Sequence, residues 1–239
     1  RRRRSLRIER RGDPVRAPTI EQARAVAQRL CDLAGVTLLR PDSILRPLIV
    51  EGVALASKVG GGAWTRADVA ERVSVTLPAA GSALSILRNV PTVGPILATL
   101  GETAGLGKDA VISPSPQTWD NAIDLLATIQ HELGHAGGIR RGKILGCLAL
   151  LVSKEARAAG EAPCYGASMA VLHSIGGWSS QAAYERAMHA LGGYALDADA
   201  MALASGILRS AQATLDAGED LGGVVSEVVT ALRAEGWSP

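Results

Sequence analysis

Apolar residues recur at three- and four-residue steps along most of the chain, which is the spacing of helices that bury one face. From Thr19 to Leu33 the pattern is clear, with Thr19 as the expected N-cap and Gly35 as the expected stop. The same spacing predicts further helices over residues 41 or 42 to 58, 65–72, 120–137, 142–159, 163–175, 179–191, 197–217 and 221–235. The pattern therefore predicts a mostly α fold.

Glycine and proline mark the expected breaks in this pattern. Gly137 and Gly138 should end the helix that begins near Asp120. Gly160 should break the next helical run, so that Pro163 falls in the first turn of a new helix, where proline is tolerated. We thus expect three separate helices between residues 120 and 175.

Strand signals are short and few. Residues 73–77 alternate as a short strand would, and Val111 and Ile112 predict an edge strand before a turn-rich segment. Residues 83–107 are apolar but interrupted by Pro and Gly, which predicts a broken helix or a packed loop. The fold is therefore expected to be α+β at most.

Composition supports a helical core. Apolar residues make up 47% of the chain, but aromatic residues only 3%, and Phe is absent. A core of Ala, Val, Leu and Ile favours closely packed helices over a sheet sandwich rich in aromatic pairs. No stretch approaches about 18 uninterrupted apolar residues, so no membrane span is expected.

Charge divides the chain unevenly. The net charge is +2, yet arginines crowd the first eleven positions. We expect residues 1–18 to form a flexible basic arm that could hold an anionic partner. Residues 19–109 are expected to form a helical region of unassigned role, and residues 110–239 a domain of their own.

The three cysteines are odd in number and lack the C-x-x-C spacing of metal or redox motifs. No apolar h-region of a signal peptide follows the basic arm. Both features favour free thiols in a reducing, cytoplasmic compartment, with a place in a virion as the alternative.

The chemistry of the chain is concentrated in residues 131–135, which read His-Glu-Leu-Gly-His within the best-supported helix. Residues four positions apart share a helix face, so His131 and His135 can reach one metal ion. Imidazole nitrogens suit zinc, and Glu132 lies beside the metal, where it can act as general base toward a metal-activated water. The spacing predicts a Zn²⁺ site that hydrolyses peptide bonds.

Residues 129–136 resemble the active-site helix of the zincin metallopeptidases, and the likeness extends loosely over residues 117–210. The metzincin branch needs a third His where Arg141 stands, so that branch is excluded. The resemblance implies a gluzincin-like site, whose third ligand is a Glu from the following helical region. It implies a zinc metallopeptidase that cleaves a peptide or protein substrate.

Two glutamates compete for the role of third ligand. Glu161 opens an apolar helix, whereas Glu155 has charged neighbours typical of a solvated residue, so we favour Glu161. The segment from Glu161 to Tyr165 is also similar to the third-ligand helix of small zincin-like proteins, including phage-encoded ones. Asp197, Asp199 or no protein ligand are the remaining alternatives.

Tyr165 follows Glu161 by four positions and so projects from the same helix face. It could donate a hydrogen bond to the oxyanion that develops during hydrolysis, or simply pack between helices. His173 and His189 are weaker candidates for the same role. Cys164 is expected to be a small buried residue.

A second class of function stays open, a non-catalytic structural or assembly protein, such as a phage particle component, that carries a zincin-like fold. The basic arm and the apolar segments before residue 110 could serve contacts with other subunits. An enzyme needs an open metal position, whereas a structural zinc is closed by a fourth protein ligand. We expect three protein ligands, an open fourth position and a groove beside Glu132.

Overall fold

The structure, a computed structural model, describes residues 16–47, 49–51, 54, 65–71, 74–78 and 110–238. For residues 69, 75–78 and 138–152 it describes the backbone alone. The expected basic arm lies outside the described residues apart from residues 16–18. The broken helix or loop expected at residues 83–107 lies wholly outside them.

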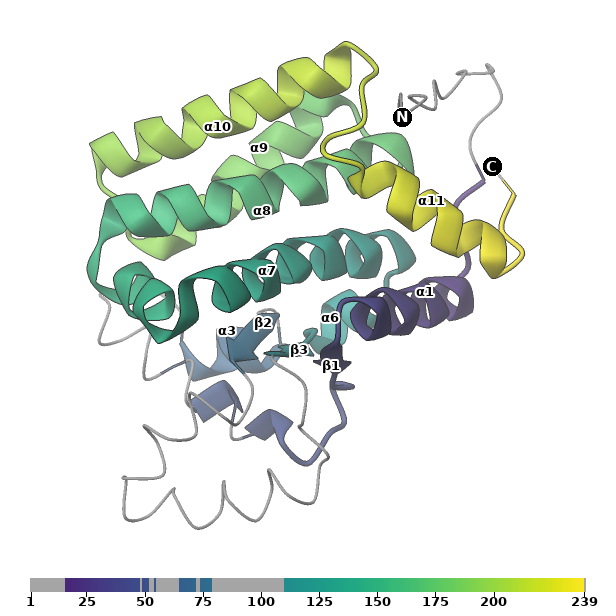
Figure 1. Cartoon of the computed structure of the whole chain (residues 1–239), viewed down its shortest axis with the longest axis horizontal. Coiled ribbons are helices and arrows are strands. Elements are labelled where there is room, and N and C mark those ends of the chain that lie inside the picture. Colours follow the sequence, from purple (N-terminus) through teal and green to yellow (C-terminus); the bar gives the residue numbers. More distant parts are fainter. Residues whose placement is uncertain are drawn as a thin grey trace.

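Helices dominate the described part of the chain, which confirms the mostly α fold (Figure 1). The helices are α1 (Ile20–Leu33), α3 (Arg66–Glu71), α6 (Pro116–Trp119), α7 (Ala122–Val152), α8 (Lys154–Ser174), α9 (Ser180–Leu191), the 3-10 turn η1 (Gly192–Tyr194), α10 (Ala198–Asp216) and α11 (Val224–Ala234). The strands are β1 (Val36–Leu38), β2 (Val75–Pro78) and β3 (Ala110–Ser113). Of the helix expected from residue 41 or 42 to 58, residues 46, 47, 49–51 and 54 are helical, and the helix starts no earlier than residue 46.

Polar side chains fix the starts of the helices. Thr19 and Gln22 form a reciprocal capping box on α1, in which each side chain accepts the other residue's backbone N–H. Ser153 accepts the N–H of Ala156 at 3.1 Å and so begins α8. Caps of this kind satisfy backbone donors that would otherwise lack partners at a helix start.

Helix α7 lies at the centre of the molecule (Figure 1). The small sheet and α1 cover one side of it, and α8 packs along the other. Helices α9 and α10 pack on α8, and α11 bridges α1 and α8. The first turns of α7 are therefore enclosed, and their residues Leu125, Leu126 and Ile129 are completely buried.

The sheet has the order β1-β3-β2. Strand β1 runs parallel to β3, with Val36 opposite Ala110, and β2 runs antiparallel to β3, with Val75 opposite Ser113. The strand expected at residues 73–77 is confirmed as β2. The expectation of an edge strand at Val111 and Ile112 is wrong, because β3 is paired on both sides and is the central strand.

Two expected helix breaks are also wrong. Gly137 and Gly138 do not end a helix, because α7 continues to Val152. Gly160 and Pro163 lie inside α8, and Pro163 is on its exposed side. A glycine inside a helix costs only about 1 kcal/mol and a proline about 3 kcal/mol, which tertiary packing can offset. The single break lies at Ser153, the N-cap of α8.

One hydrophobic core joins elements from both sides of the boundary expected at residue 110. Val26 of α1 and Val36 of β1 belong to the same buried cluster as Ile112, Met169 and Leu232. The boundary itself stays a prediction, since most of residues 48–109 lie outside the described part. Of the elements that the structure describes in residues 19–109, α1 and β2 pack directly on α7.

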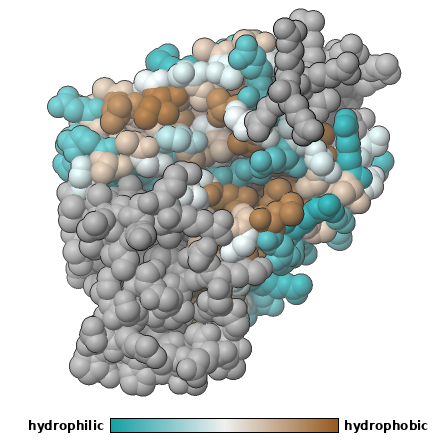
Figure 2. Space-filling view, viewed as in Figure 1, coloured by the Kyte–Doolittle hydropathy of each residue, from teal (hydrophilic) through white to brown (hydrophobic). Residues whose placement is uncertain are grey.

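The surface carries an apolar band over α10 (Figure 2). Leu203, a residue of α10, is 43% exposed.

Among the helices that the structure describes, none combines the length and hydropathy needed to cross a bilayer. Cys31 and Cys164 are buried, and neither forms a disulfide within the described part of the chain.

Candidate metal centre

Helix α7 fixes the two histidines and the glutamate of the motif. Its completely buried residue Ile129 anchors the turn that precedes them in the core. His131 and Glu132 are themselves buried, with exposed fractions of 6% and 4%, and His135 is partly buried one turn later. Polar groups so deep in a protein need partners, because burial without them costs several kcal/mol.

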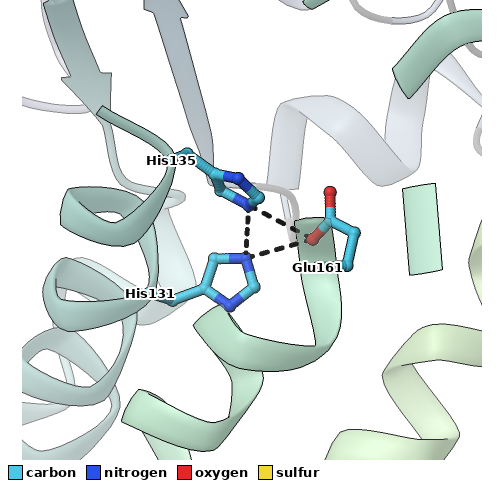
Figure 3. A group of neighbouring side chains, drawn as sticks. All are labelled: His131, His135 and Glu161. Atoms are coloured by element: carbon cyan, nitrogen blue, oxygen red, sulfur yellow. Dashed lines mark hydrogen bonds and ion pairs between the residues drawn. The ribbon is translucent and has the colours of Figure 1, made fainter. Parts of the chain in front are cut away.

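Helix α8 supplies the third side chain. Figure 3 shows the rings of His131 and His135 pointing toward each other and toward the carboxylate of Glu161. The Nε2 atoms of the two histidines lie 3.0 Å apart. The Oε2 atom of Glu161 lies 3.3 Å from Nε2 of His131 and 3.2 Å from Nε2 of His135. These three buried or half-buried residues could hold a metal ion.

The spacing of the three atoms fits a metal ion. Ligand atoms bound at 2.0–2.1 Å in a tetrahedron lie about 3.3 Å from one another. The separations of 3.0, 3.2 and 3.3 Å are close to this edge length without further movement. Two imidazoles and a carboxylate are also the donor set of many catalytic zinc sites.

The electrostatics show that this position favours positive charge. Burial opposes the charged form of His135, but the carboxylate of Glu161 and hydrogen bonds with Cys164 and Glu161 outweigh it and raise the pKa of His135 well above 6.5. Burial likewise opposes ionisation of Glu161, yet the charge of His135 and hydrogen bonds from both imidazoles hold the pKa of Glu161 well below its usual value. The carboxylate that favours a proton on His135 would likewise favour a metal cation between these three side chains.

Glu132 lies on the wall of a cavity of about 300 Å³ that also borders His131. The cavity lies between α7, α8 and α9, and its far wall is built from small and apolar residues such as Met169, Ala183 and Ala187. Arg186 stands at the cavity with its guanidinium 2.8 Å from the carboxylate of Asp124. Glu132 is thus both buried and adjacent to a space that a ligand could enter.

Two tyrosines line the same cavity. The ring of Tyr165 meets the ring of His131 edge to face, with 4.4 Å between centroids. Its hydroxyl lies 3.3 Å from the hydroxyl of Tyr194. Burial, reinforced by the charge of Glu161, raises the pKa of both phenols, so both stay protonated at neutral pH and can donate hydrogen bonds.

A hydrogen bond to the backbone of Tyr194 holds this residue in place. Tyr194 ends η1, and its carbonyl accepts a hydrogen bond of 2.7 Å from Arg157 of α8. The next residue, Ala195, has φ 53°, a left-handed conformation that costs a residue with a Cβ about 1–2 kcal/mol. Local strain of this kind often accompanies a functional site.

The other candidates lie elsewhere. Glu155 is exposed in the first turn of α8, where its carboxylate accepts a hydrogen bond of 2.9 Å from Ser153. Asp197 caps α10 and Asp199 is exposed in its first turn. Nδ1 of His173 donates a hydrogen bond of 2.8 Å to the carbonyl of Trp178, and His189 is exposed near the end of α9. None of these five joins the group around His131.

Sequence reasoning missed Tyr194 and undervalued Cys164. Tyr194 lies 29 residues after Tyr165, on an element without periodicity, so no local spacing could reveal it. Cys164 lies inside α8 and is small and buried as expected, but it also contacts His135, with 3.7 Å between Sγ and Nδ1. Its position three residues after Glu161 was the available signal.

Comparison with models of known protein families, with curated proteins and with solved structures finds no match for this chain.

Proposed function

We propose that this protein is a zinc-dependent hydrolase of peptide bonds. The observation that carries the proposal is the convergence of His131, His135 and Glu161 within 3.3 Å of one another, next to a cavity that Glu132 borders. This arrangement supplies three ligands of the type zinc prefers and a carboxylate beside them that is not a ligand. The resemblance of residues 129–136 to the zincin helix points the same way.

The residues divide the chemistry of hydrolysis among them. A bound zinc ion supplies Lewis-acid chemistry, which makes water a stronger acid and polarises a carbonyl group. The carboxylate of Glu132 takes a proton from the attacking water, whose oxygen forms a bond to the carbonyl carbon. Glu132 then passes the proton to the amide nitrogen as the carbon–nitrogen bond breaks, leaving a carboxylic acid and an amine.

Tyr165 and Tyr194 are placed to stabilise the negative charge that develops on the carbonyl oxygen. Both phenols stay protonated and both line the cavity beside His131. A hydrogen bond to a developing oxyanion in a site that excludes water is worth several kcal/mol. Because the two hydroxyls lie 3.3 Å apart, one can support the other while it donates.

The position of β2 supports an extended peptide as substrate. Among the strands that the structure describes, β2 pairs only with β3, and Ser74, directly before β2, lines the cavity. The free edge of a strand can bind an extended peptide through backbone hydrogen bonds.

The presence of Glu132 beside the candidate site favours zinc over iron as the metal that it binds. Two histidines and one carboxylate also bind Fe(II) in oxygenases, and the observed separations suit either metal. Oxygen chemistry at iron needs open coordination positions but no adjacent carboxylate base. A buried glutamate beside the first histidine is what metal-assisted hydrolysis requires.

A structural zinc is the competing function. Such sites are closed by a fourth protein ligand. Within the described ranges, the group that could hold a metal contains His131, His135 and Glu161 and no fourth His, Cys, Asp or Glu. This supports an open position and therefore the enzyme.

The decisive experiment compares the wild type with Glu132→Gln. Metal content of both proteins is measured by elemental analysis, and both are incubated with an unbiased peptide library. We expect about one equivalent of zinc in each and cleavage by the wild type alone, with a loss of at least about 100-fold in rate, because only the general base is removed.

Three outcomes would overturn the proposal. Bound iron in place of zinc would reject the metal, and equal cleavage by both proteins would reject Glu132 as the base. A zinc-loaded wild type that cleaves nothing in the library would favour the structural role.

A further inference from the structure

Cys164 occupies a position next to the metal centre that the hydrolytic mechanism does not use. Its side chain is buried in α8, one turn after Glu161. The Sγ atom lies 3.7 Å from Nδ1 of His135 and 3.3 Å from the carbonyl oxygen of Gly160. The thiol therefore connects the ring of His135 to the backbone of Gly160, the residue directly before Glu161.

The orientation of His135 determines what this contact can do. Its Nε2 faces His131 and Glu161, so Nε2 is the nitrogen available to a metal and must then carry no proton. The ring proton consequently resides on Nδ1, which faces the sulfur of Cys164. The thiol in turn donates its own proton to the Gly160 carbonyl. All hydrogen bonds then run in one direction, from Nδ1–H to Sγ and from S–H to the carbonyl oxygen.

Metal-binding histidines generally donate their second N–H to a carboxylate, a carbonyl or a water, and this partner fixes the ring and its tautomer. Among the described contacts of His135, Cys164 is the one that involves Nδ1. We propose that Cys164 is a positioning residue of the metal centre: its thiol accepts the Nδ1–H of His135 and holds the ring so that Nε2 faces the metal.

Gly134 provides an independent observation in favour of a fixed sulfur. A Cβ atom at position 134 would lie 2.7 Å from Sγ of Cys164, closer than real Cβ contacts allow. The glycine inside the metal-binding motif is therefore matched to the sulfur, and the helices α7 and α8 meet closely at this point. A side chain at position 134 would therefore force the thiol of Cys164 out of its present position.

This proposal rests on the metal site proposed above but not on hydrolysis, so it is tested by metal binding. Zinc affinity is measured by competition with a chromophoric chelator for the wild type, Cys164→Ala and Cys164→Ser. We expect Cys164→Ala to lose about 10- to 100-fold in affinity. Cys164→Ser should stay within about threefold of wild type, because a hydroxyl can accept from Nδ1 and donate to the Gly160 carbonyl as the thiol does.

A comparison of Gly134→Ala with the double variant Gly134→Ala/Cys164→Ala separates the orientation of the His135 ring from the packing of α7 on α8. Gly134→Ala alone should lower both thermal stability and zinc affinity, because the new methyl group displaces the sulfur. Removing the sulfur in the double variant relieves the clash, so its thermal stability should return to that of Cys164→Ala. Its zinc affinity should stay at the reduced level of Cys164→Ala, since no group then faces Nδ1.

Cobalt substitution distinguishes positioning from direct ligation. The near-ultraviolet spectrum of the Co²⁺ wild type should lack a sulfur-to-cobalt charge-transfer band. The visible d–d bands should change in Cys164→Ala, as the ring of His135 reorients. A charge-transfer band in the wild type would make Cys164 a ligand and overturn the proposal. So would equal zinc affinity in the wild type and Cys164→Ala, or wild-type affinity in the double variant. A wild type that binds no zinc would instead reject the metal site itself.

Discussion

His131, His135 and Glu161 come from two helices, yet their ligand atoms meet within 3.3 Å. The spacing of the histidines is local, because one helical turn separates them. The candidate third ligand is not local: the apolar surroundings of Glu161 favoured it over Glu155, and the packing of α8 on α7 brings Glu161 to the histidines. The two candidate histidine ligands therefore follow from their spacing in the sequence, whereas the position of the candidate glutamate ligand depends on the fold.

Removal of single ligands tests this assignment. His131→Ala and His135→Ala should abolish zinc uptake, and Glu161→Ala should weaken it strongly, because each removes one of the three candidate donors. Glu155→Ala is the matched control on the same helix, since Glu155 is exposed and contacts Ser153. Zinc content after dialysis is the measurement. A loss of zinc in Glu155→Ala and its retention in Glu161→Ala would reverse the choice of ligand.

The tyrosines test how the cavity stabilises charge. Tyr165→Phe and Tyr194→Phe should each retain zinc but lower kcat by about 10-fold or more, because each removes a hydroxyl next to the reacting carbonyl without removing a ligand. Tyr184→Phe is the control, since its hydroxyl bonds to Ser205 away from the cavity. If KM changes while kcat does not, the tyrosines bind substrate rather than the transition state.

The sequence predicted the motif helix and the favoured glutamate, but not Tyr194 or the contact of Cys164 with His135. His131, Glu132 and His135 lie in one short segment, and the four-residue spacing of the two histidines predicts that they share a helix face. Tyr194 reaches the site through the irregular η1 turn, which Arg157 and the left-handed Ala195 hold in place. No local pattern encodes a contact between residues so far apart in the chain.

At the scale of elements, glycine was the main source of error. Gly137, Gly138 and Gly160 resemble helix stops in the sequence but lie inside α7 and α8. The packing of α7 on α8, α1 and the sheet offsets a cost of about 1 kcal/mol per glycine. The central position of β3 was missed for a related reason, because its pairing with β1 joins residues more than 70 positions apart.

Two other glycines allow this cost to be measured. Gly206 lies inside α10 with open space where a Cβ would be, so Gly206→Ala should stabilise the protein by about 0.5–1 kcal/mol. At Gly176 a Cβ would lie 2.6 Å from the backbone oxygen of Leu172, which cannot easily move. Gly176→Ala should therefore destabilise the protein. Denaturant unfolding of both variants is the measurement, and opposite signs are required.

At the scale of the whole molecule, the candidate metal centre lies between the sheet side of the core and the helical side. α7 contacts the sheet and α1, whereas α8 contacts α9, α10 and α11. An ion held by side chains of both α7 and α8 binds the folded state and not the unfolded chain. Zinc should therefore stabilise the whole fold, by about 2.7 kcal/mol at a free concentration one hundred times Kd.

The stabilisation by zinc should grow as pH rises from 6 to 8. The pKa of His135 in the metal-free fold is raised above 6.5, so its proton stabilises that fold below the unfolded pKa, and this contribution is lost as pH rises through the folded value. The same proton competes with zinc at low pH, so metal affinity increases as it leaves. The pKa of Glu161 is depressed, so Glu161 stays ionised throughout this range and adds no slope.

The measurement is the Tm with zinc and with chelator at each pH. A zinc-induced rise of about 5–10 °C is expected at pH 8, with a smaller rise at pH 6. His135→Ala, which lacks both the proton and the ligand, should show no zinc-induced rise at any pH, whereas Glu155→Ala should follow the wild type. A rise that is equal at pH 6 and pH 8 would mean that no histidine proton competes with the metal, and the coupling of His135 to Glu161 would then be wrong.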